Sequence, residues 1–572
     1  MKAAAQGKSR LAKAWTAVLT WQNAVYLGLA LTSVLLYSAA YPPVELSGLA
    51  WAALTPWLMV VFICPPGRQV IISAIAGMAF FFLNVWWIAP VTIPGYITMS
   101  IYLGLYWALA GWVIHRLVRV NHWPAFVAVP VVWAGLEYLR AWMVTGFPWF
   151  FLGHSQVRNL AIIQVADLVG AYGVTFLVAM VNGFFAELIY QVYSGGWRTR
   201  RGVVAIAVVL PLLSGAFIYG VWRLGQDTVY AGPRLAVVQE DFPLTVNGES
   251  PSLGKSLSAH LKISREAAGQ GPAMIVWPET SIGISLNPEY RTHPTEDEDL
   301  RDVQGLSQQV YDVLSEHARE AQAHLIVGAI SKEFNTPGTY PEVNKYNSAL
   351  VFAPDGELAD RYDKIHLVLF GEFVPFRYSV PPLYRFLNEN MTPYGQGGYE
   401  YSLTHGQEVK RFELTAGGES YRYGVAICYE DAMAYLIRRF VSPENDRKQI
   451  DFLINISNDG WFNHSAELPQ HLQICAFRAV ENRVGIARSV NTGISGFIDP
   501  TGRIDEVVGN GAYGRGTRGS VVRAIKLDKR VSFYSRYGDW FAIICLAVTA
   551  AAAVKADAAF GRVLGRRTTT TP

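Results

Sequence analysis

Cys428 is the residue in this sequence best placed to act as a nucleophile. It follows the apolar run Tyr423–Ile427 and precedes a helical pattern. Unsatisfied backbone N–H groups at a helix start favour a thiolate and can also hold an oxyanion. Most free cysteines are small buried hydrophobic residues, so this run alone fits either role. The adjacent Glu430 and Asp431 disfavour a thiolate, so catalysis would require a separate base.

Glu279 is a candidate for that base. The motif Trp277-Pro278-Glu279-Thr280 places its carboxylate in a turn after the apolar strand pattern Met274–Val276. A carboxyl group partly enclosed by aromatic and apolar neighbours has a raised pKa, as a general base requires. Taken alone, this motif is also explained by a solvent-exposed glutamate in a loop, with no catalytic role.

Lys364 could stabilise negative charge on a tetrahedral intermediate, because an ammonium group near a thiolate and a carboxylate favours a developing oxyanion. It lies beside Asp363, so a surface ion pair also explains it. His366 is the usual type of partner for a catalytic cysteine. No Asn or Asp at a papain-like position accompanies it, so we expect a structural histidine.

The remaining thiols and the overall charge exclude several function classes. Cys64 and Cys545 lie in apolar runs, which leaves Cys475 as the alternative to Cys428. The sequence has no C-x-x-C and no Cys/His cluster at zinc-ligand spacing, so we expect no metal site and no cofactor. The net charge is +3, and no basic cluster with interleaved aromatic residues occurs, so nucleic acid is not an expected partner.

Charged residues are unevenly spread over the 572 residues that must position these groups. The chain is 51% hydrophobic and 16% charged, whereas a soluble protein has about 25% charged residues. Residues 1–223 contain only 17 Asp, Glu, Lys and Arg residues, roughly 8%, against roughly 22% in residues 224–572. We therefore expect a membrane-embedded N-terminal part followed by a domain of ordinary soluble composition.

Eight apolar stretches approach the length of about 20 residues that crosses a bilayer. They lie near 22–41, 47–64, 69–94, 96–114, 122–144, 160–190, 202–223 and 540–560, and the sixth could include an interfacial portion. Cationic residues gather before the first stretch and after the second, fourth, sixth and eighth: Lys2, Lys8, Arg10, Lys13, Arg68, Arg116, Arg119, Arg198, Arg200, Arg201, Arg562, Arg566 and Arg567. The positive-inside rule then predicts that both termini are cytoplasmic and that residues 224–539 lie on the far side of the membrane.

Residues 234–530 predict a layered α/β domain covered by helices, because buried strand patterns alternate with helical ones. Strand patterns lie at 235–239, 274–279, 324–330, 348–353, 423–428, 451–457 and 485–491, and helical patterns at 300–323, 432–440 and 468–483. The acidic segment 285–300 and the Pro- and Gly-rich segment 377–400 are expected to be long loops over an active site. The domains are therefore 1–223 (about seven transmembrane helices), 224–539 (the α/β domain) and 540–572 (the last transmembrane helix and tail).

The three motifs together resemble the nitrilase, or carbon–nitrogen hydrolase, superfamily: WPE at Glu279, DK ahead of FGE at Lys364, and CYE at Cys428. This resemblance implies a Glu-Lys-Cys triad on an αββα sandwich. Further motifs resemble the apolipoprotein N-acyltransferase family: TGFPW at 145–149, GHSQ at 153–156, QVAD at 164–167, GAYG at 170–173, NISNDGWF at 455–462 and the helix at 470–482. The resemblance covers roughly residues 20–550.

The resemblance implies a role for each matching residue. Cys428 is expected to be the nucleophile, Glu279 the general base and Lys364 the support of the oxyanion. Three more residues match acidic or adjacent positions that the family has at its site: Glu372, Tyr429 and Glu430. Leu369 departs from the pattern, because family members commonly have Pro there.

The implied activity is a ping-pong acyl transfer at the inner membrane, with the α/β domain on the periplasmic side. A membrane phospholipid would donate an acyl chain to the cysteine as a thioester. The acceptor would be the N-terminal α-amine of the diacylglyceryl-cysteine of an apolipoprotein, in the last step of lipoprotein maturation. The implied partners are therefore the phospholipid, the apolipoprotein and the membrane.

Two other functions remain open at this stage. A membrane-anchored amidase could use the same triad with water as the acceptor, although a soluble substrate gives no reason for seven preceding spans. A transporter or receptor could use the outer domain only to bind a ligand, but a complete triad argues against that reading.

The predicted membrane part contains polar and aromatic residues that need an explanation. Glu137, Arg140 and Asp167 are costly in lipid, so we expect them to face the bundle interior or the α/β domain. A Glu137–Arg140 pair at i,i+3 is the simplest expectation for the first two. Seven aromatic residues are expected near the membrane interface: Trp86, Trp87, Trp142, Trp149, Phe147, Phe150 and Phe151.

Overall fold

Two six-stranded sheets pack face to face in the C-terminal part of the chain. The computed structural model describes residues 21–195, 200–242, 251–336, 342–377, 379–392, 401–509 and 517–567. The first sheet has the order β12 (Gly519–Asp528), β1 (Val229–Gln239), β2 (Met274–Val276), β3 (His324–Phe334), β4 (Val343–Phe352) and β5 (Leu358–Asp363). The second has the order β11 (Ile504–Val507), β10 (Gly496–Ile498), β9 (Gly485–Val490), β8 (Phe452–Ser457), β7 (Glu419–Ile427) and β6 (Phe412–Ala416).

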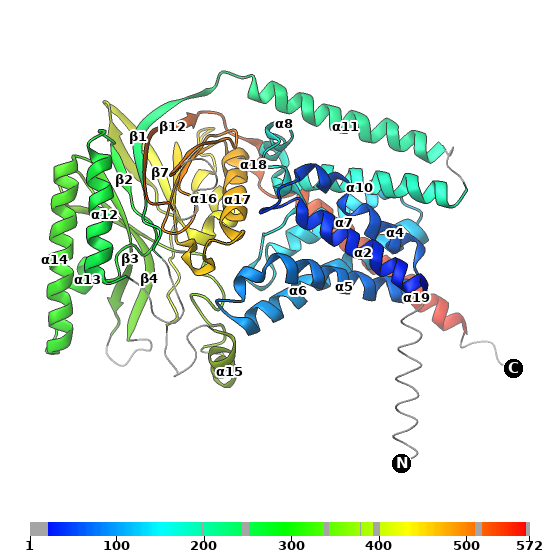
Figure 1. Cartoon of the computed structure of the whole chain (residues 1–572), viewed down its shortest axis with the longest axis horizontal. Helices are drawn as coiled ribbons and strands as arrows, with labels where there is room; N and C mark the ends of the chain where they lie inside the picture. Colours follow the sequence, from blue (N-terminus) through cyan, green and yellow to red (C-terminus); the bar gives the residue numbers. More distant parts are fainter. Residues whose placement is uncertain are drawn as a thin grey trace, which may run out of the picture.

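Helices cover both outer faces of the sandwich (Figure 1). On the first sheet lie α12 (Leu253–Ala268) and α14 (Glu298–Ala321), and on the second lie α16 (Ala434–Val441) and α17 (Glu467–Asn482). The central strands β1–β3 and β7–β9 are parallel neighbours. Their sequences are nearly continuous apolar runs, as expected for parallel strands buried on both faces. The predicted αββα architecture is confirmed.

All seven predicted strands are present among the described residues, but five further strands were missed. The missed strands β5, β6, β10, β11 and β12 are short or mix polar with apolar residues, so their patterns are weak. Both predicted long loops also contain helices. The segment 285–300 contains α13 (Pro288–Arg291) and the start of α14, where the Asp297 side chain accepts from two backbone N–H groups. The segment 377–400 contains α15 (Pro381–Met391), and its residues 378 and 393–400 lie outside the described residues.

Four of the described helices are long and apolar enough to cross a membrane: Pro66–Asn84, Ile93–Val120, Ala171–Tyr193 and Arg201–Leu224. They correspond to α5, to α6 (Ile93–His115) with the turn after it, to α10 and to α11 (Arg200–Leu224). The prediction of eight spans is therefore confirmed only in part. The cationic tail residues before position 21 and Arg198 lie outside the described residues.

The other predicted spans correspond to helices that are not among these four candidates. They are α2 (Trp21–Ala39), α3 (Ala50–Ala53) with α4 (Thr55–Ile63), α7 (Ala125–Arg140) and α19 (Trp540–Arg567). The predicted stretch 160–190 begins with the short helices α8 (Leu160–Ile163) and α9 (Ala166–Val169), and only α10 (Ala171–Tyr193) is long. The long predicted stretch is therefore divided, and the expected interfacial portion stays a prediction.

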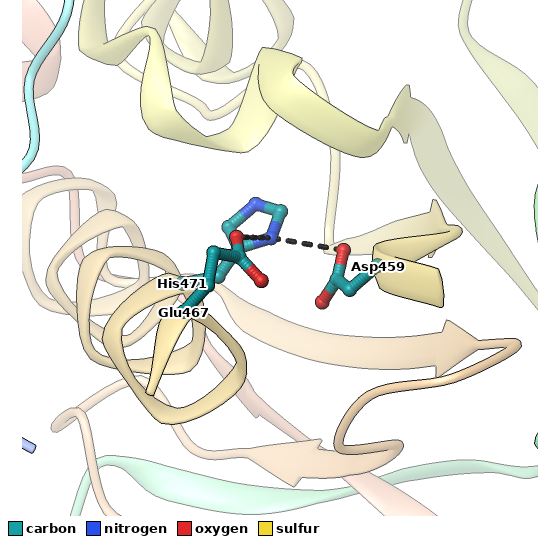
Figure 2. A group of neighbouring side chains, drawn as sticks. All are labelled: Asp459, Glu467 and His471. Carbon is teal, nitrogen blue, oxygen red and sulfur yellow. Dashed lines mark hydrogen bonds and ion pairs between the residues drawn. The ribbon is translucent and has the colours of Figure 1, made fainter. Parts of the chain in front are cut away.

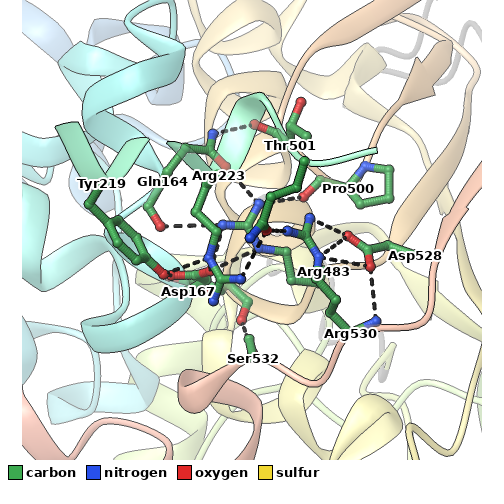
Figure 3. Close-up of polar contacts among 12 residues, drawn as sticks. Gln164, Asp167, Tyr219, Arg223, Arg483, Pro500, Thr501, Asp528, Arg530 and Ser532 are labelled. Carbon is green, nitrogen blue, oxygen red and sulfur yellow. Dashed lines mark hydrogen bonds and ion pairs between the residues drawn. The ribbon is translucent and has the colours of Figure 1, made fainter. Parts of the chain in front are cut away.

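A buried ionic network joins the membrane helices to the sandwich (Figure 3). Asp167, on α9, lies 2.6 Å from Nη2 of Arg483 and 3.0 Å from Nε of Arg223. Its other oxygen accepts a 2.6 Å hydrogen bond from Tyr219 of α11. Arg483 ends α17 in the sandwich, so Asp167 faces the α/β domain, as the sequence predicted.

Glu137 and Arg140 do not form the predicted i,i+3 pair in the described structure; both bind the loop after α7 instead. Glu137 accepts a 2.7 Å hydrogen bond from the Leu152 backbone N–H, and Arg140 donates a 2.7 Å bond to the Trp149 carbonyl oxygen. Backbone N–H and carbonyl groups of a buried loop must be hydrogen-bonded. This requirement outweighs the gain from pairing the two side chains with each other.

The seven aromatic residues expected near the membrane interface differ in their exposure. Trp86 and Trp142 are about half exposed, at 52% and 48%. The other five are buried inside the protein: Trp87, Trp149, Phe147, Phe150 and Phe151. Trp87 and Trp149 contact Phe462 and Tyr429 of the sandwich, so these two rings pack the junction between the bundle and the sandwich.

Candidate active site

Glu279, Lys364 and Cys428 lie at the carboxyl ends of strands in the two facing sheets. Glu279 is three residues beyond β2, and Lys364 directly follows β5, both in the first sheet. Cys428 directly follows β7 in the second sheet. Gly328 of β3 allows the Glu279 turn to approach, because a Cβ there would meet the Pro278 carbonyl oxygen at 2.3 Å. The fold therefore brings together the three residues predicted from separate motifs.

Lys364 is the centre of a buried carboxylate cluster. Its Nζ lies 2.9 Å from Glu372 Oε1 and 3.3 Å from Glu279 Oε1, and the side chain is 1% exposed. Asn347 Nδ2 donates to the same two oxygens, at 2.6 Å to Glu279 and 2.9 Å to Glu372. Glu372 also accepts a 2.8 Å bond from the backbone N–H of Val368. Two carboxylates, one ammonium and one amide thus hold each other in place.

The charges of this cluster act on the enclosed thiol of Cys428, a residue that as a whole is partly exposed. Burial raises the pKa of Cys428 well above its ordinary value, and the Glu279 carboxylate raises it further, whereas the Lys364 ammonium lowers it. Burial also raises the pKa of Glu279, against the opposing effect of Lys364. Burial lowers the pKa of Lys364, but the Glu279 and Glu372 carboxylates outweigh it and raise that pKa well above normal. The site therefore contains a neutral thiol, a carboxyl group that can take a proton and a fixed ammonium ion.

Cys428 adopts a left-handed backbone conformation, with φ of 52°. A non-glycine residue in this region is strained, and such strain is often found at functional sites. The helix predicted at 432–440 is present as α16, but it starts at Ala434, and the five-residue 3-10 turn η6 (Cys428–Ala432) separates it from the thiol. The turn is too short to provide a helix dipole at the thiol.

Glu430 fixes the Cys428 turn to the Lys364 segment. Its buried carboxylate accepts hydrogen bonds from the backbone N–H of Ile427 at 2.8 Å and of Ile365 at 2.7 Å. The Tyr362 hydroxyl also donates to it, at 2.9 Å. Burial raises the pKa of Glu430 to about 7, although these donors oppose the change. Because the carboxylate is held by these donors, its role is to connect two segments.

Tyr429 points from the turn toward the membrane helices. Its hydroxyl donates a 2.7 Å hydrogen bond to the carbonyl oxygen of Gly146, in the loop after α7. The Trp149 ring stacks on the Tyr429 ring at 5.3 Å with an interplanar angle of 13°. The candidate site is thus in direct contact with the membrane part of the chain.

The other two candidate residues, His366 and Cys475, lie in environments that fit structural roles. The Nδ1 atom of His366 lies 2.8 Å from the Tyr435 hydroxyl, and burial lowers the pKa of His366 to about 4. This agrees with the structural role predicted for His366. Cys475 is fully buried within α17, where burial raises its pKa well above normal.

Sequence reasoning missed Asn347 and Tyr362, which bind the predicted residues directly. Asn347 is a polar residue on β4 at the start of an apolar run, and Tyr362 is a buried aromatic residue two positions before Lys364. A buried polar side chain in a central strand requires a partner, and that is the signal which could have identified Asn347.

Comparisons with known proteins match both parts of the chain to family models. Residues 234–530 match the family model for carbon-nitrogen hydrolases, and residues 33–184 match that for the apolipoprotein N-acyltransferase N-terminal domain. The fold and the site therefore define a carbon–nitrogen hydrolase domain carried on a helical membrane part.

The full-length comparison gives the particular family. An apolipoprotein N-acyltransferase of Geobacter metallireducens is 31% identical over 557 residues, covering 94% of this chain and 95% of that protein. That of Caulobacter vibrioides is 28% identical and covers 84% of this chain and 85% of that protein. This chain belongs to the apolipoprotein N-acyltransferase family. Among solved structures, the nitrilase-superfamily protein Nit3 of Saccharomyces cerevisiae covers 53% of this chain and 92% of its own, at 19% identity and a TM-score of 0.34.

Proposed function

We propose that this chain is an acyltransferase that moves an acyl chain from a membrane phospholipid to the N-terminal α-amine of a diacylated apolipoprotein, by way of a thioester on Cys428. The observation that carries the proposal is the contact of Tyr429 with Gly146 and Trp149. It attaches the residue next to the thiol to a loop of the membrane part, where lipid substrates would arrive. An amidase acting on a small soluble amide has no use for this attachment, and the family relationship does not favour it.

In the first half-reaction Glu279 takes the Cys428 proton and the thiolate attacks an ester carbonyl carbon of the phospholipid. Lys364, with backbone N–H groups, stabilises the oxyanion of the tetrahedral intermediate. The carbon–oxygen bond then breaks, Glu279 returns the proton to the leaving alkoxide, and the lysophospholipid departs. The cysteine is left as an acyl thioester.

In the second half-reaction the free α-amine of the lipoprotein attacks the thioester carbonyl carbon. Glu279 accepts a proton from the amine, the carbon–sulfur bond breaks and an amide forms. The proton then returns to the Cys428 thiolate. Glu372 and Asn347 keep Glu279 and Lys364 in position through both steps, which is the support that a preorganised site requires.

The proposal includes a membrane topology. Eight crossings would place residues 1–223 and 540–572 in the inner membrane and its cytoplasmic margin. Residues 224–539 would then lie in the periplasm, with both termini in the cytoplasm. The cationic residues near the ends of the predicted spans support this orientation.

The test is to incubate the purified full chain with a phospholipid labelled in its acyl chain. We expect a hydroxylamine-labile label on the wild type and on Cys475→Ala, and none on Cys428→Ala. Absence of label from the wild type would overturn the mechanism. A diacylated lipopeptide should then discharge the label as an amide, whereas discharge by water alone would favour a hydrolase.

A further inference from the structure

Five ionisable side chains form a second buried cluster next to Cys428, outside the group around Lys364. They come from the turn η6, the 3-10 turn η7 (Asp459–Phe462), α17 and β9, and each is at most 2% exposed: Asp431, Asp459, Glu467, His471 and Arg488. Burying so many ionisable groups is costly unless their charges are paired. The pattern of pairing therefore indicates what the cluster does.

His471 lies between the carboxylate of Asp431, in the Cys428 turn, and that of Asp459, in η7. Its Nε2 is 2.7 Å from Asp431 Oδ1, and its Nδ1 is 3.1 Å from Asp459 Oδ1. Burial and the nearby Arg488 guanidinium oppose the charged form, but the Asp431 and Asp459 charges outweigh them and raise the pKa of His471 to about 10. Because an imidazolium donates from both nitrogens, His471 can bind both carboxylates at once.

Arg488 bridges the same two carboxylates from β9. Its Nη1 donates to Asp431 Oδ2 at 2.7 Å, and its Nη2 donates to Asp459 Oδ2 at 2.9 Å. Two anions and two cations thus form a closed ring. Burial and the Asp459 charge raise the pKa of Glu467, the fifth member of the cluster, well above its normal value, which favours its neutral form.

Asp459, Glu467 and His471 have the residue types and spacing of a metal-binding group (Figure 2). Glu467 Oε1 is only 3.5 Å from His471 Nδ1. However, each imidazole nitrogen already faces a carboxylate, and Arg488 supplies the second positive charge. The arrangement is electrically balanced by its own side chains, which favours an ionic network over a metal centre.

This network is in contact with the reacting thiol. Asp431 is three residues beyond Cys428, and the hydroxyl of Ser457, at the end of β8, donates a 2.7 Å hydrogen bond to Asp459 Oδ1. Besides Glu279 and Lys364 from the first sheet, the thiol interacts with the Asp459 charge and with the Ser457 hydroxyl. An uncompensated Asp459 carboxylate would oppose formation of the thiolate.

We propose that His471 is a positioning residue for the acyl transfer: it ties Asp431 of the Cys428 turn to Asp459 of η7 and, with Arg488, neutralises the Asp459 charge beside the thiol. The bridge also explains how the strained Cys428 backbone is held, because Asp431 belongs to the same turn. The inference rests on the proposed role of Cys428, but its test measures the thiol directly and needs no acyl substrate.

The test is the rate of Cys428 alkylation by iodoacetamide as a function of pH, followed on the peptide that contains Cys428 in the detergent-solubilised full chain. In His471→Asn we expect the apparent pKa of the thiol to rise by about one unit, which slows alkylation about tenfold at a fixed pH below it. His317→Asn is the matched control, because His317 is also buried but binds Ser264 under the other sheet. It should leave the Cys428 profile unchanged.

Two further variants separate neutralisation from simple support of the fold. Asp459→Asn alone should lower the apparent pKa of the thiol, because it removes the anion and leaves both cations. When Asp459→Asn is combined with His471→Asn, the apparent pKa of the thiol should return toward the wild-type value. If His471 had only a structural role, the second substitution would instead lower the alkylation rate further. The proposal is overturned if the apparent pKa of the thiol is unchanged in both His471→Asn and Asp459→Asn, whatever the stability of either variant.

Metal analysis of the wild-type chain provides an independent check. A stoichiometric divalent cation that is lost in His471→Asn would also overturn the proposal, in favour of a metal site. If the alkylation shifts appear but the wild type takes no label from phospholipid, the acyltransferase mechanism fails while the role of His471 stands.

Discussion

Tyr429 and Gly146, 283 positions apart in the chain, are joined by a 2.7 Å hydrogen bond from the phenol hydroxyl to the carbonyl oxygen. Gly146 belongs to the loop after α7, and Trp149 of that loop stacks on the Tyr429 ring. The position of Cys428 relative to the membrane helices is thus set by its neighbouring residue. For substrates held in a bilayer, that position decides whether the ester carbonyl reaches the thiol.

Tyr429→Phe should slow thioester formation from phospholipid while leaving the stacked ring in place. A hydrogen bond of this kind contributes about 1 kcal/mol, so we expect a rate about fivefold lower. Tyr421→Phe is the matched control, since it removes a 2.7 Å hydrogen bond to Glu419 at the far end of β7. Equal rates for Tyr429→Phe and the wild type would mean that the hydrogen bond does not position the thiol.

Asn347→Ala should shift the pH dependence of thioester formation. Asn347 donates to Glu279 Oε1 at 2.6 Å and so favours the ionised carboxylate, lowering its pKa against the effect of burial. Without this donor the pKa of Glu279 rises, so less of the base is ionised at a given pH. The acidic limb of the pH–rate profile for thioester formation therefore moves to higher pH. A bond to a charged group is worth about 1.5 kcal/mol, so the limb should move by about one pH unit.

The control for this shift is Asn344→Ala on the same strand. Asn344 Nδ2 donates to Asn335 at 3.1 Å and does not contact the carboxylate cluster in the described structure. Its variant should keep the acidic limb of the wild type. If Asn347→Ala lowers the rate equally at every pH, the amide supports the geometry of the site without tuning the base.

Single-cysteine labelling should establish the proposed topology. In a Cys-less chain, Ser258→Cys lies on the exposed side of α12, and Asn121→Cys lies at the turn between α6 and α7. An impermeant maleimide should label Ser258→Cys in right-side-out vesicles and Asn121→Cys only after permeabilisation. The reverse pattern would place the sandwich in the cytoplasm and would contradict the assignment from Arg116 and Arg119.

The sequence predicted those parts of the protein in which a local pattern determines the structure. The apolar runs of β2 and β8 are buried on both faces, so their strands were evident, and three short motifs identified Glu279, Lys364 and Cys428. Polar strands such as β5 were missed because no periodic pattern distinguishes them from loops.

The parts that could not be predicted depend on contacts between distant segments. Glu137 and Arg140 are three residues apart, which favours a pair, yet each binds backbone of a later loop that only the tertiary fold brings there. Asn347 and His471 likewise acquire their roles from residues far away in the sequence. Motifs therefore identified the proposed reacting groups but not the side chains that hold them.

Asp167→Asn should weaken the junction between the membrane helices and the sandwich. Asp167 is the carboxylate partner of both Arg483, whose side chain is 1% exposed, and Arg223. Removing one partner of a buried ion pair leaves an uncompensated charge, at a cost of about 3 kcal/mol or more. We therefore expect a lower free energy of unfolding in detergent, measured by denaturant titration of tryptophan fluorescence.

The loss of unfolding free energy in Asp167→Asn should be specific to the buried charge. Glu316→Gln breaks an exposed pair with Arg319 on α14 and should cost at most about 0.5 kcal/mol. Adding Arg483→Gln to Asp167→Asn should recover part of the loss, because the unpaired buried cation is then removed. Strictly additive effects of the two substitutions would contradict direct pairing and would indicate that other contacts hold the membrane helices against the sandwich.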